Sequence, residues 1–217
     1  MKTWKRNFNT RTIIPNVNLT SQYLSDIEAL LEGGPRTEFG WFCLVDYDQA
    51  SHTFTLDSLL LPDQEVSSST CELSPESLAR IQTGLFKEDN AAGIKPSDRG
   101  FRMNKMRGWF HSHVDMAVTP SSQDDAQVES FGKNNKWPYA IRGIVNLKME
   151  MKIDVFWFER FTHFTDVPWQ VVSDQAAVTR WSALAKERIK PLARETGLFN
   201  YADRLSDWQY GAGSWSE

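Results

Sequence analysis

The sequence contains few of the residues that build disulfides or metal clusters. Only two cysteines, Cys43 and Cys71, and four histidines occur among its 217 residues. Two cysteines exclude a disulfide scaffold and a cysteine-rich zinc module. Long apolar runs are also absent, and none follows the basic start of the chain. We therefore expect neither a membrane span nor a signal peptide, and the expected location is the cytoplasm.

Positive charge is scarce as well. The chain carries 24 Lys and Arg against 28 Asp and Glu, which makes its formal net charge -4. Nucleic acid and anionic membranes both require a basic surface, so we expect neither as a partner. Apolar residues make up 41% of the chain, as is typical of a globular protein. A chain of this length can bury a core without disulfides or metals.

Helix and strand patterns alternate irregularly along the chain. Apolar residues recur at helical spacing from Ser21 until Gly33-Gly34-Pro35 ends the helix. The other expected elements are strands at 39–45, 52–61, 106–113, 140–147 and 152–158, helices from Ser74, from Pro120 and over 176–193, and a loop at 87–100. Since the strands do not alternate regularly with helices, we predict an α+β fold with a mixed, mostly antiparallel sheet flanked by helices.

The same patterns suggest three segments. Residues 1–19 form an N-terminal arm or edge strand, residues 20–161 form the core domain, and residues 162–217 form a C-terminal helical extension packed on that core. A core of about 140 residues is an ordinary size for one domain.

One stretch combines residue types that bind metals. His111 and His113 lie two positions apart on a predicted strand, so their side chains point to the same face. The chain then turns, and Asp124 lies in the first turn of the next helix, near enough to return to the same place. Two imidazoles and one carboxylate are the three ligands of a catalytic zinc site, which keeps a fourth position open for water. We predict that these residues bind one Zn²⁺.

Each half of this pattern is weak by itself. Two histidines can share the face of any strand, and the spacing of Ser121 and Asp124 is also a common helix-capping pattern. In the purely structural alternative, Ser121 and Ser122 only cap the helix. Asp115 is expected to be a loop residue, and Cys43, His52 and His163 to be structural or surface residues.

The small number of histidines excludes other metal sites. A di-zinc β-lactamase-type site requires a further histidine where this chain has Met116, and more histidines downstream. Amidohydrolase barrels need more histidines and a longer chain. Cupin-type sites need a glutamate shortly after the second histidine, and none lies between Val114 and Pro120.

The spacing His111-x-His113, seven residues, Ser121, two residues, Asp124 resembles the signature of the JAMM (MPN-plus) zinc metalloprotease family. That family includes deubiquitinating isopeptidases and prokaryotic relatives, and the chain is similar to a prokaryotic or phage-type member. Its motif also has a glutamate on the first strand after the first helix, closely followed by glycine. Glu38-Phe-Gly40 occupies that place here. The resemblance covers residues 20 to 160 and implies an MPN/JAMM, cytidine-deaminase-like core.

The resemblance implies a role for each motif residue. His111, His113 and Asp124 would hold the zinc, and Glu38 would be the general base that passes a proton to the leaving amine. Ser121 would donate a hydrogen bond to the oxyanion of the tetrahedral intermediate. Without these roles, Glu38 would be an exposed carboxylate where a strand begins, and Glu32 is the alternative base.

Two positions depart from the family pattern. The family commonly has proline after the second histidine, where this chain has Val114, and many members have two glycines on the first strand, where residues 41–44 have none. Neither position is a ligand. We therefore expect the chemistry to be kept and the substrate groove to differ.

The family resemblance also implies a substrate. Members cleave an amide bond after the flexible C-terminal tail of a ubiquitin-like modifier, which they bind as an added strand. A protein partner would contact loop 87–105 or the C-terminal extension. Two alternatives stay open: a JAMM peptidase with an unrelated substrate, such as a phage structural protein or a cell-wall peptide, and a non-catalytic MPN scaffold. The complete ligand set argues against the scaffold, because scaffolds of this fold typically lose these residues.

Overall fold

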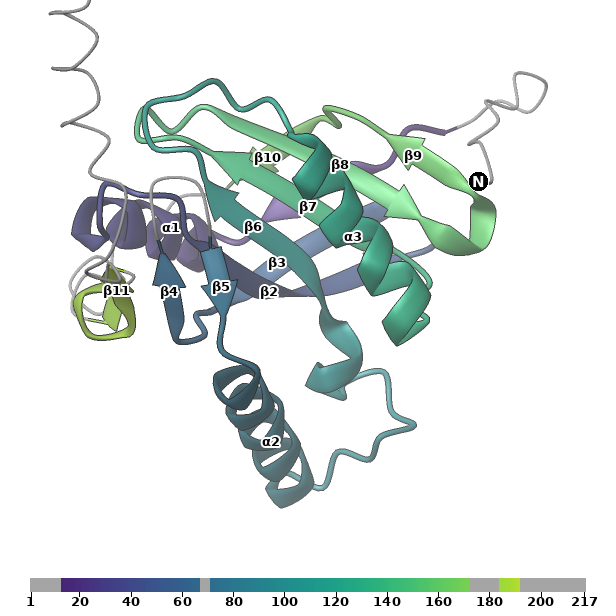
Figure 1. Cartoon of the computed structure of the whole chain (residues 1–217). Coiled ribbons are helices and arrows are strands. Elements are labelled where there is room, and N and C mark those ends of the chain that lie inside the picture. The colour runs from purple at the N-terminus through teal and green to yellow at the C-terminus, as the bar shows by residue number, and fades with distance from the viewer. Residues whose placement is uncertain (1–12, 67–70, 172–183, 192–217) are drawn as a thin grey trace, which may run out of the picture.

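A computed structural model describes residues 13–66, 71–171 and 184–191. Its centre is an eight-stranded sheet with the strand order β10-β1-β3-β2-β6-β7-β8-β9 (Figure 1). In chain order these strands are β1 (Asn16–Leu19), β2 (Gly40–Asp48), β3 (Thr53–Leu60), β6 (Met106–Ser112), β7 (Ala140–Val145), β8 (Met151–Trp157), β9 (Thr162–Phe164) and β10 (Trp169–Val171).

The sheet is mixed. Strand β2 pairs antiparallel with β3 and with β6, and β8 pairs antiparallel with β7 and with β9. Three ladders are parallel: β1 with β10, β1 with β3, and β6 with β7. With helices packed on both faces, this arrangement confirms the predicted α+β class and the mixed sheet. The two predicted hairpins, β2–β3 and β7–β8, are also present.

Helices cover the two faces of the sheet. Helix α1 (Ser21–Gly33) begins at Thr20, whose hydroxyl accepts a hydrogen bond from the backbone N–H of Tyr23. Its apolar side packs in one core cluster with Trp41 and Phe110. Helix α3 (Ser122–Asn135) lies across the opposite face (Figure 1) and contributes Val128 and Phe131 to a second cluster.

The close packing of the first face depends on a glycine in β7. A Cβ atom on Gly143 would lie 1.8 Å from a ring carbon of Phe110. Glycine therefore allows the aromatic ring of the neighbouring strand to lie directly against the β7 backbone.

Helix α2 (Pro75–Ala91) extends away from the sheet (Figure 1). Ser74 is its N-cap, as predicted, but the helix continues to Ala91, although the sequence pattern predicts a loop from position 87. Asp89 explains the extra turn: its buried carboxylate accepts hydrogen bonds from the backbone N–H of Arg102 at 2.7 Å and from its Nε at 2.6 Å. This contact anchors the end of α2 to the short 3-10 helix η1 (Arg102–Lys105). A second 3-10 helix, η2 (Phe158–Arg160), follows β8.

The predicted helix over 176–193 is wrong at its C-terminal end, and residues 172–183 lie outside the described residues. Residues 184–188 are helical, but Ile189–Pro191 form strand β11, parallel to β4 (Gln64–Val66). Strand β4 also pairs with β5 (Cys71–Leu73), which makes a small second sheet. A proline cannot continue a helix but is tolerated on an edge strand, and Pro191 lies on the edge strand of this sheet.

Parts of the segment after residue 161 belong to the folded core. Strands β9 and β10 are the two outer strands of the main sheet, and Ala185 and Ile189 are buried in the first core cluster. The described part of the predicted extension therefore packs on the core, while most of the N-terminal arm (1–12) lies outside the described residues. Among the described helices, none has both the length and the apolar character needed to cross a bilayer.

Candidate metal centre

Strand β6 ends at Ser112, so His111 lies in the strand and His113 follows it directly, both toward the α3 face of the sheet. It lies between β2 and β7, and His111 is paired with Gly40 on one side and with Ile144 on the other. Side chains alternate along a strand, so Phe110 enters the core under α1 while His111 and His113 face the other way. The ring of His111 stacks on Trp109, with ring centroids 4.7 Å apart.

Helix α3 brings Asp124 to the histidines through a capping box. The backbone N–H of Asp124 donates to Ser121 Oγ at 3.2 Å, and the backbone N–H of Ser121 donates to Asp124 Oδ2 at 2.7 Å. These bonds leave the other carboxylate oxygen for the site. Asp124 Oδ1 lies 3.3 Å from His111 Nε2.

Three ligand atoms converge at this place. His111 Nε2 and His113 Nε2 are 3.0 Å apart, and one ligand atom from each of His111, His113 and Asp124 lies within 4.8 Å of the others. Tetrahedral zinc with bonds of about 2.0–2.1 Å holds its ligands roughly 3.3 Å apart, so the donor set and its spacing fit that ion. The predicted metal site is confirmed as a group that could hold a metal ion.

The protonation of His113 also suits a ligand. Its Nδ1 lies 2.7 Å from the carbonyl oxygen of Ala117, which can only accept, so Nδ1 carries the proton. In a neutral ring Nε2 then offers its lone pair to the site. His111 differs, because its buried Nδ1 has no hydrogen-bond partner among the described residues. Stacking on Trp109 orients that ring instead.

Asp124 is held as a carboxylate. Burial by itself raises the pKa of Asp124, but hydrogen bonding and charge from His111, together with hydrogen bonds from Ser121, outweigh burial and lower the pKa well below its usual value. An ionised carboxylate is the form that binds metal.

The turn after His113 has a strained backbone. Val114 has a φ of 48°, a left-handed conformation that is rare for a β-branched residue. Two backbone bonds from the end of β7 hold the turn: His113 N–H to Val145 O and Leu147 N–H to Val114 O, each at 2.8 Å. Proline is locked near a φ of −65°, so the residue that the family commonly has here could not adopt this turn.

Glu38 precedes β2 by two residues, and the β2–β6 register relates it to the site. Gly40 pairs with His111, and the backbone N–H of Ser112 donates to Phe39 O, so a further continuation of this register would set Glu38 opposite His113. Glu38 is partly buried and is not one of the three converging residues. Its role as a base stays a prediction.

Ser112 ties the Glu38 segment to β6. Its buried hydroxyl accepts a hydrogen bond from the backbone N–H of Phe39 at 3.1 Å and donates to the carbonyl of Thr37 at 3.3 Å. The backbone N–H of Ser112 also donates to Phe39 O at 2.9 Å. The residues on both sides of Glu38 are therefore attached to the residue between the two histidines.

Ser121 is the N-cap of α3, as in the structural alternative, and its hydroxyl donates to Asp124 Oδ2 at 2.9 Å. Its proposed contact with an oxyanion stays a prediction.

Four other polar residues lie in the structural or surface positions expected from the sequence: Cys43, His52, Asp115 and His163. Asp115 is exposed in the turn. Cys43 is buried, and burial raises the pKa of its thiol to about 12. His52 hydrogen-bonds Tyr47, and His163 stacks on Phe156.

Sequence reasoning missed a buried ion network beside the site. Arg142 on β7 bonds to Asp125 in the first turn of α3 and to Asp154 on β8. A signal existed, because one arginine and one aspartate interrupt the otherwise apolar stretches at 140–145 and 153–158.

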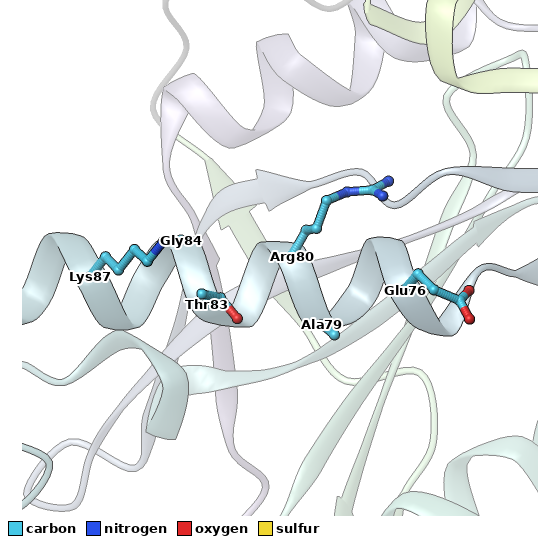
Figure 2. A pocket seen from close by; sticks show the side chains of 6 residues that line it. All are labelled: Glu76, Ala79, Arg80, Thr83, Gly84 and Lys87. Carbon is cyan, nitrogen blue, oxygen red and sulfur yellow. The ribbon is translucent and has the colours of Figure 1, made fainter.

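A hollow on α2 is a separate feature. It is lined by Glu76, Ala79, Arg80, Thr83, Gly84 and Lys87, all from one helix (Figure 2). Its lining contains no histidine or cysteine, and Glu76 is its only acid. The hollow therefore does not offer the ligand set that the histidine site offers.

Comparisons with known proteins add little. No family model matches the chain, and no curated protein matches it. Among solved structures, the chain is similar to the solution structure of protein DSY2949 from Desulfitobacterium hafniense, with 15% identity and a TM-score of 0.47. The alignment covers 74% of this chain and 95% of that chain. This likeness carries no argument about function.

Proposed function

We propose that the chain is a zinc-dependent peptidase of the JAMM (MPN-plus) type that hydrolyses an amide bond. The observation that supports it most is the convergence of His111, His113 and Asp124, whose ligand atoms lie within 4.8 Å of one another. These three residues would hold the ion and leave a position open for a reactant. Their spacing in the sequence is that of the family motif.

The chain supplies a candidate proton carrier beside this group. Zinc, when bound, provides a Lewis acid that polarises a carbonyl and lowers the pKa of a water molecule to near neutrality. Glu38 would accept a proton from the attacking water and deliver it to the leaving amine nitrogen. The pairing of Gly40 with His111 supports this assignment, because Glu38 lies two residues before Gly40 and His113 two residues after His111.

Ser121 is the proposed oxyanion donor. In this structure its hydroxyl donates to Asp124 Oδ2, so it must rotate toward the substrate to stabilise negative charge there. The proposed substrate, an amide bond after the C-terminal tail of a ubiquitin-like modifier, rests on the family resemblance alone.

Metal analysis and a cleavage assay test the proposal together. The purified full chain should contain one zinc ion and should cut a fusion placed after the tail of a ubiquitin-like protein. A chelator should stop cleavage, and added zinc should restore it. A chain without bound metal would contradict the proposal. A chain that binds zinc but cuts neither these fusions nor cell-wall peptides would support the scaffold alternative.

A pair of glutamate variants tests the base. Glu38→Gln should keep the zinc and lose turnover by roughly 10²–10⁴-fold, because the side chain keeps its size but cannot accept the proton. Glu32→Gln is the matched control, since Glu32 is exposed at the end of α1. Equal turnover of the Glu38 variant and the native chain would refute the assignment of the base.

A further inference from the structure

An arginine is buried beneath the start of α3. Arg142 is 1% exposed and lies on β7, the strand next to the histidine strand. Its guanidinium Nη1 donates to Asp125 Oδ1 at 2.5 Å, and its Nε donates to Asp154 Oδ2 at 3.1 Å, with a further bond from Nη2 to the same oxygen. The group also lies over the ring of Phe156, 5.0 Å from its centroid.

Asp154 holds the guanidinium in one orientation. It is also 1% exposed, and its second oxygen accepts a hydrogen bond from the backbone N–H of Asp166 at 2.8 Å. A buried charge is costly unless it is paired and hydrogen-bonded, so this pairing determines where Arg142 can point. Two of its nitrogens face Asp154, and the third reaches the first turn of α3.

The residue that Arg142 reaches is next to a metal ligand. Asp125 follows Asp124 in the chain. The capping box sets Asp124 relative to its own helix, because both of its bonds are to Ser121. It does not set the helix end relative to the sheet. Arg142 connects the helix end to the sheet. It lies on β7, where it pairs with Trp109 of β6, and Trp109 precedes His111 by two residues.

We propose that Arg142, acting through Asp125, is a positioning residue that holds the carboxylate of Asp124 at the distance from the histidines that metal binding requires. This inference rests on the proposed zinc site. Residues that orient metal ligands typically contribute about 10–100-fold to metal affinity. The chemical role of the network is therefore preorganisation of the site rather than contact with the ion or the substrate.

Zinc affinity of the full chain, measured by competition with a chromogenic chelator, tests the proposal. Asp125→Asn is the main variant, because the Asp125 side chain is 57% exposed and asparagine keeps its shape. We expect zinc affinity to fall by about 10–100-fold while the metal-free variant keeps its fold. Glu129→Gln is the control: this acid lies on the same helix with its side chain 44% exposed, and the variant should bind zinc like the native chain.

Arg142→Lys and the double variant complete a cycle. Both single changes act on one contact, so the double variant should bind zinc about as weakly as the weaker single variant. A merely structural role would lower the melting temperature of the metal-free chain and leave zinc affinity unchanged in variants that are still folded. Native affinity in folded Asp125→Asn, or independent addition of the two losses, would overturn the positioning role. A native chain without zinc affinity would overturn the proposed function as well.

Discussion

The two faces of the central sheet use the same strands for different purposes. On the α1 face, β2 and β6 contribute Trp41 and Phe110, which pack on Tyr23 in an apolar core. On the α3 face lie His111 of β6 and His113, which directly follows that strand. A strand changes its face at every residue, so one segment can stabilise the fold with one set of side chains and hold polar ligands with the other.

The candidate metal ligands and the Arg142–Asp125 ion pair lie where α3 begins. Further along the helix, Val128 and Phe131 pack on an apolar cluster. At its first turn the neighbours are polar: Asp124 faces the histidines, and Asp125 meets Arg142. Zinc affinity and the free energy of unfolding should therefore respond separately to substitutions on the two faces.

The largest expected effect is the loss of a metal ligand. His111→Ala, His113→Ala or Asp124→Ala should abolish zinc retention and reduce turnover to background, because two ligands do not hold the ion. The metal-free chain should change in free energy of unfolding by only about 1 kcal/mol. Elemental analysis and chemical denaturation measure the two quantities, and retained zinc in any of the three variants would contradict the site.

Phe110, the neighbour of His111 in the chain, should show the opposite pattern, with a loss of stability and no loss of zinc affinity. Phe110→Ala should lower the free energy of unfolding by about 3–5 kcal/mol, because it leaves a cavity between α1 and the sheet. Zinc affinity should stay near the native value wherever the variant is folded. Phe110→Leu is the control and should lose less. A large loss of zinc affinity in folded Phe110→Leu would show that the two faces are coupled.

Ser112 tests whether its contact with the Glu38 segment matters for turnover. Ser112→Ala should leave the buried N–H of Phe39 without its side-chain acceptor and cost about 1–3 kcal/mol of stability. Turnover should fall while zinc is retained, because the freed segment carries Glu38. Ser112→Thr keeps the hydroxyl and should restore both quantities. Unchanged turnover in Ser112→Ala would mean that this hydroxyl does not position Glu38.

The smallest expected effect concerns His163. Burial lowers the pKa of His163, which stacks on Phe156 beneath the α3 face. Its folded pKa lies below the unfolded value of about 6.5, so its contribution to stability is complete above that pH and is lost as pH falls below it. The free energy of unfolding, measured from pH 8 to pH 5, should therefore fall less in His163→Phe than in the native chain. Identical pH profiles would contradict a buried neutral imidazole.

The long elements and the ligands were predictable because their signals are local. The helix from Ser21, the two hairpins and the strand that leads into the two histidines have clear periodicity or spacing. The three-residue strands β4, β5, β9, β10 and β11 do not, because so short a segment becomes a strand only when a partner lies beside it. The last turn of α2 likewise depends on the distant pair of Asp89 and Arg102.

Local spacing alone required that His111 and His113 share one side of a strand, because side-chain direction follows from backbone geometry. The amino-acid order could not decide which helix meets that side, or that a buried arginine holds it there. Phe39 and Ser112 are 73 positions apart, yet their hydrogen bond ties the Glu38 segment to the ligands. Contacts of this kind arise only when burial brings distant segments together, because an isolated segment has no partner for them.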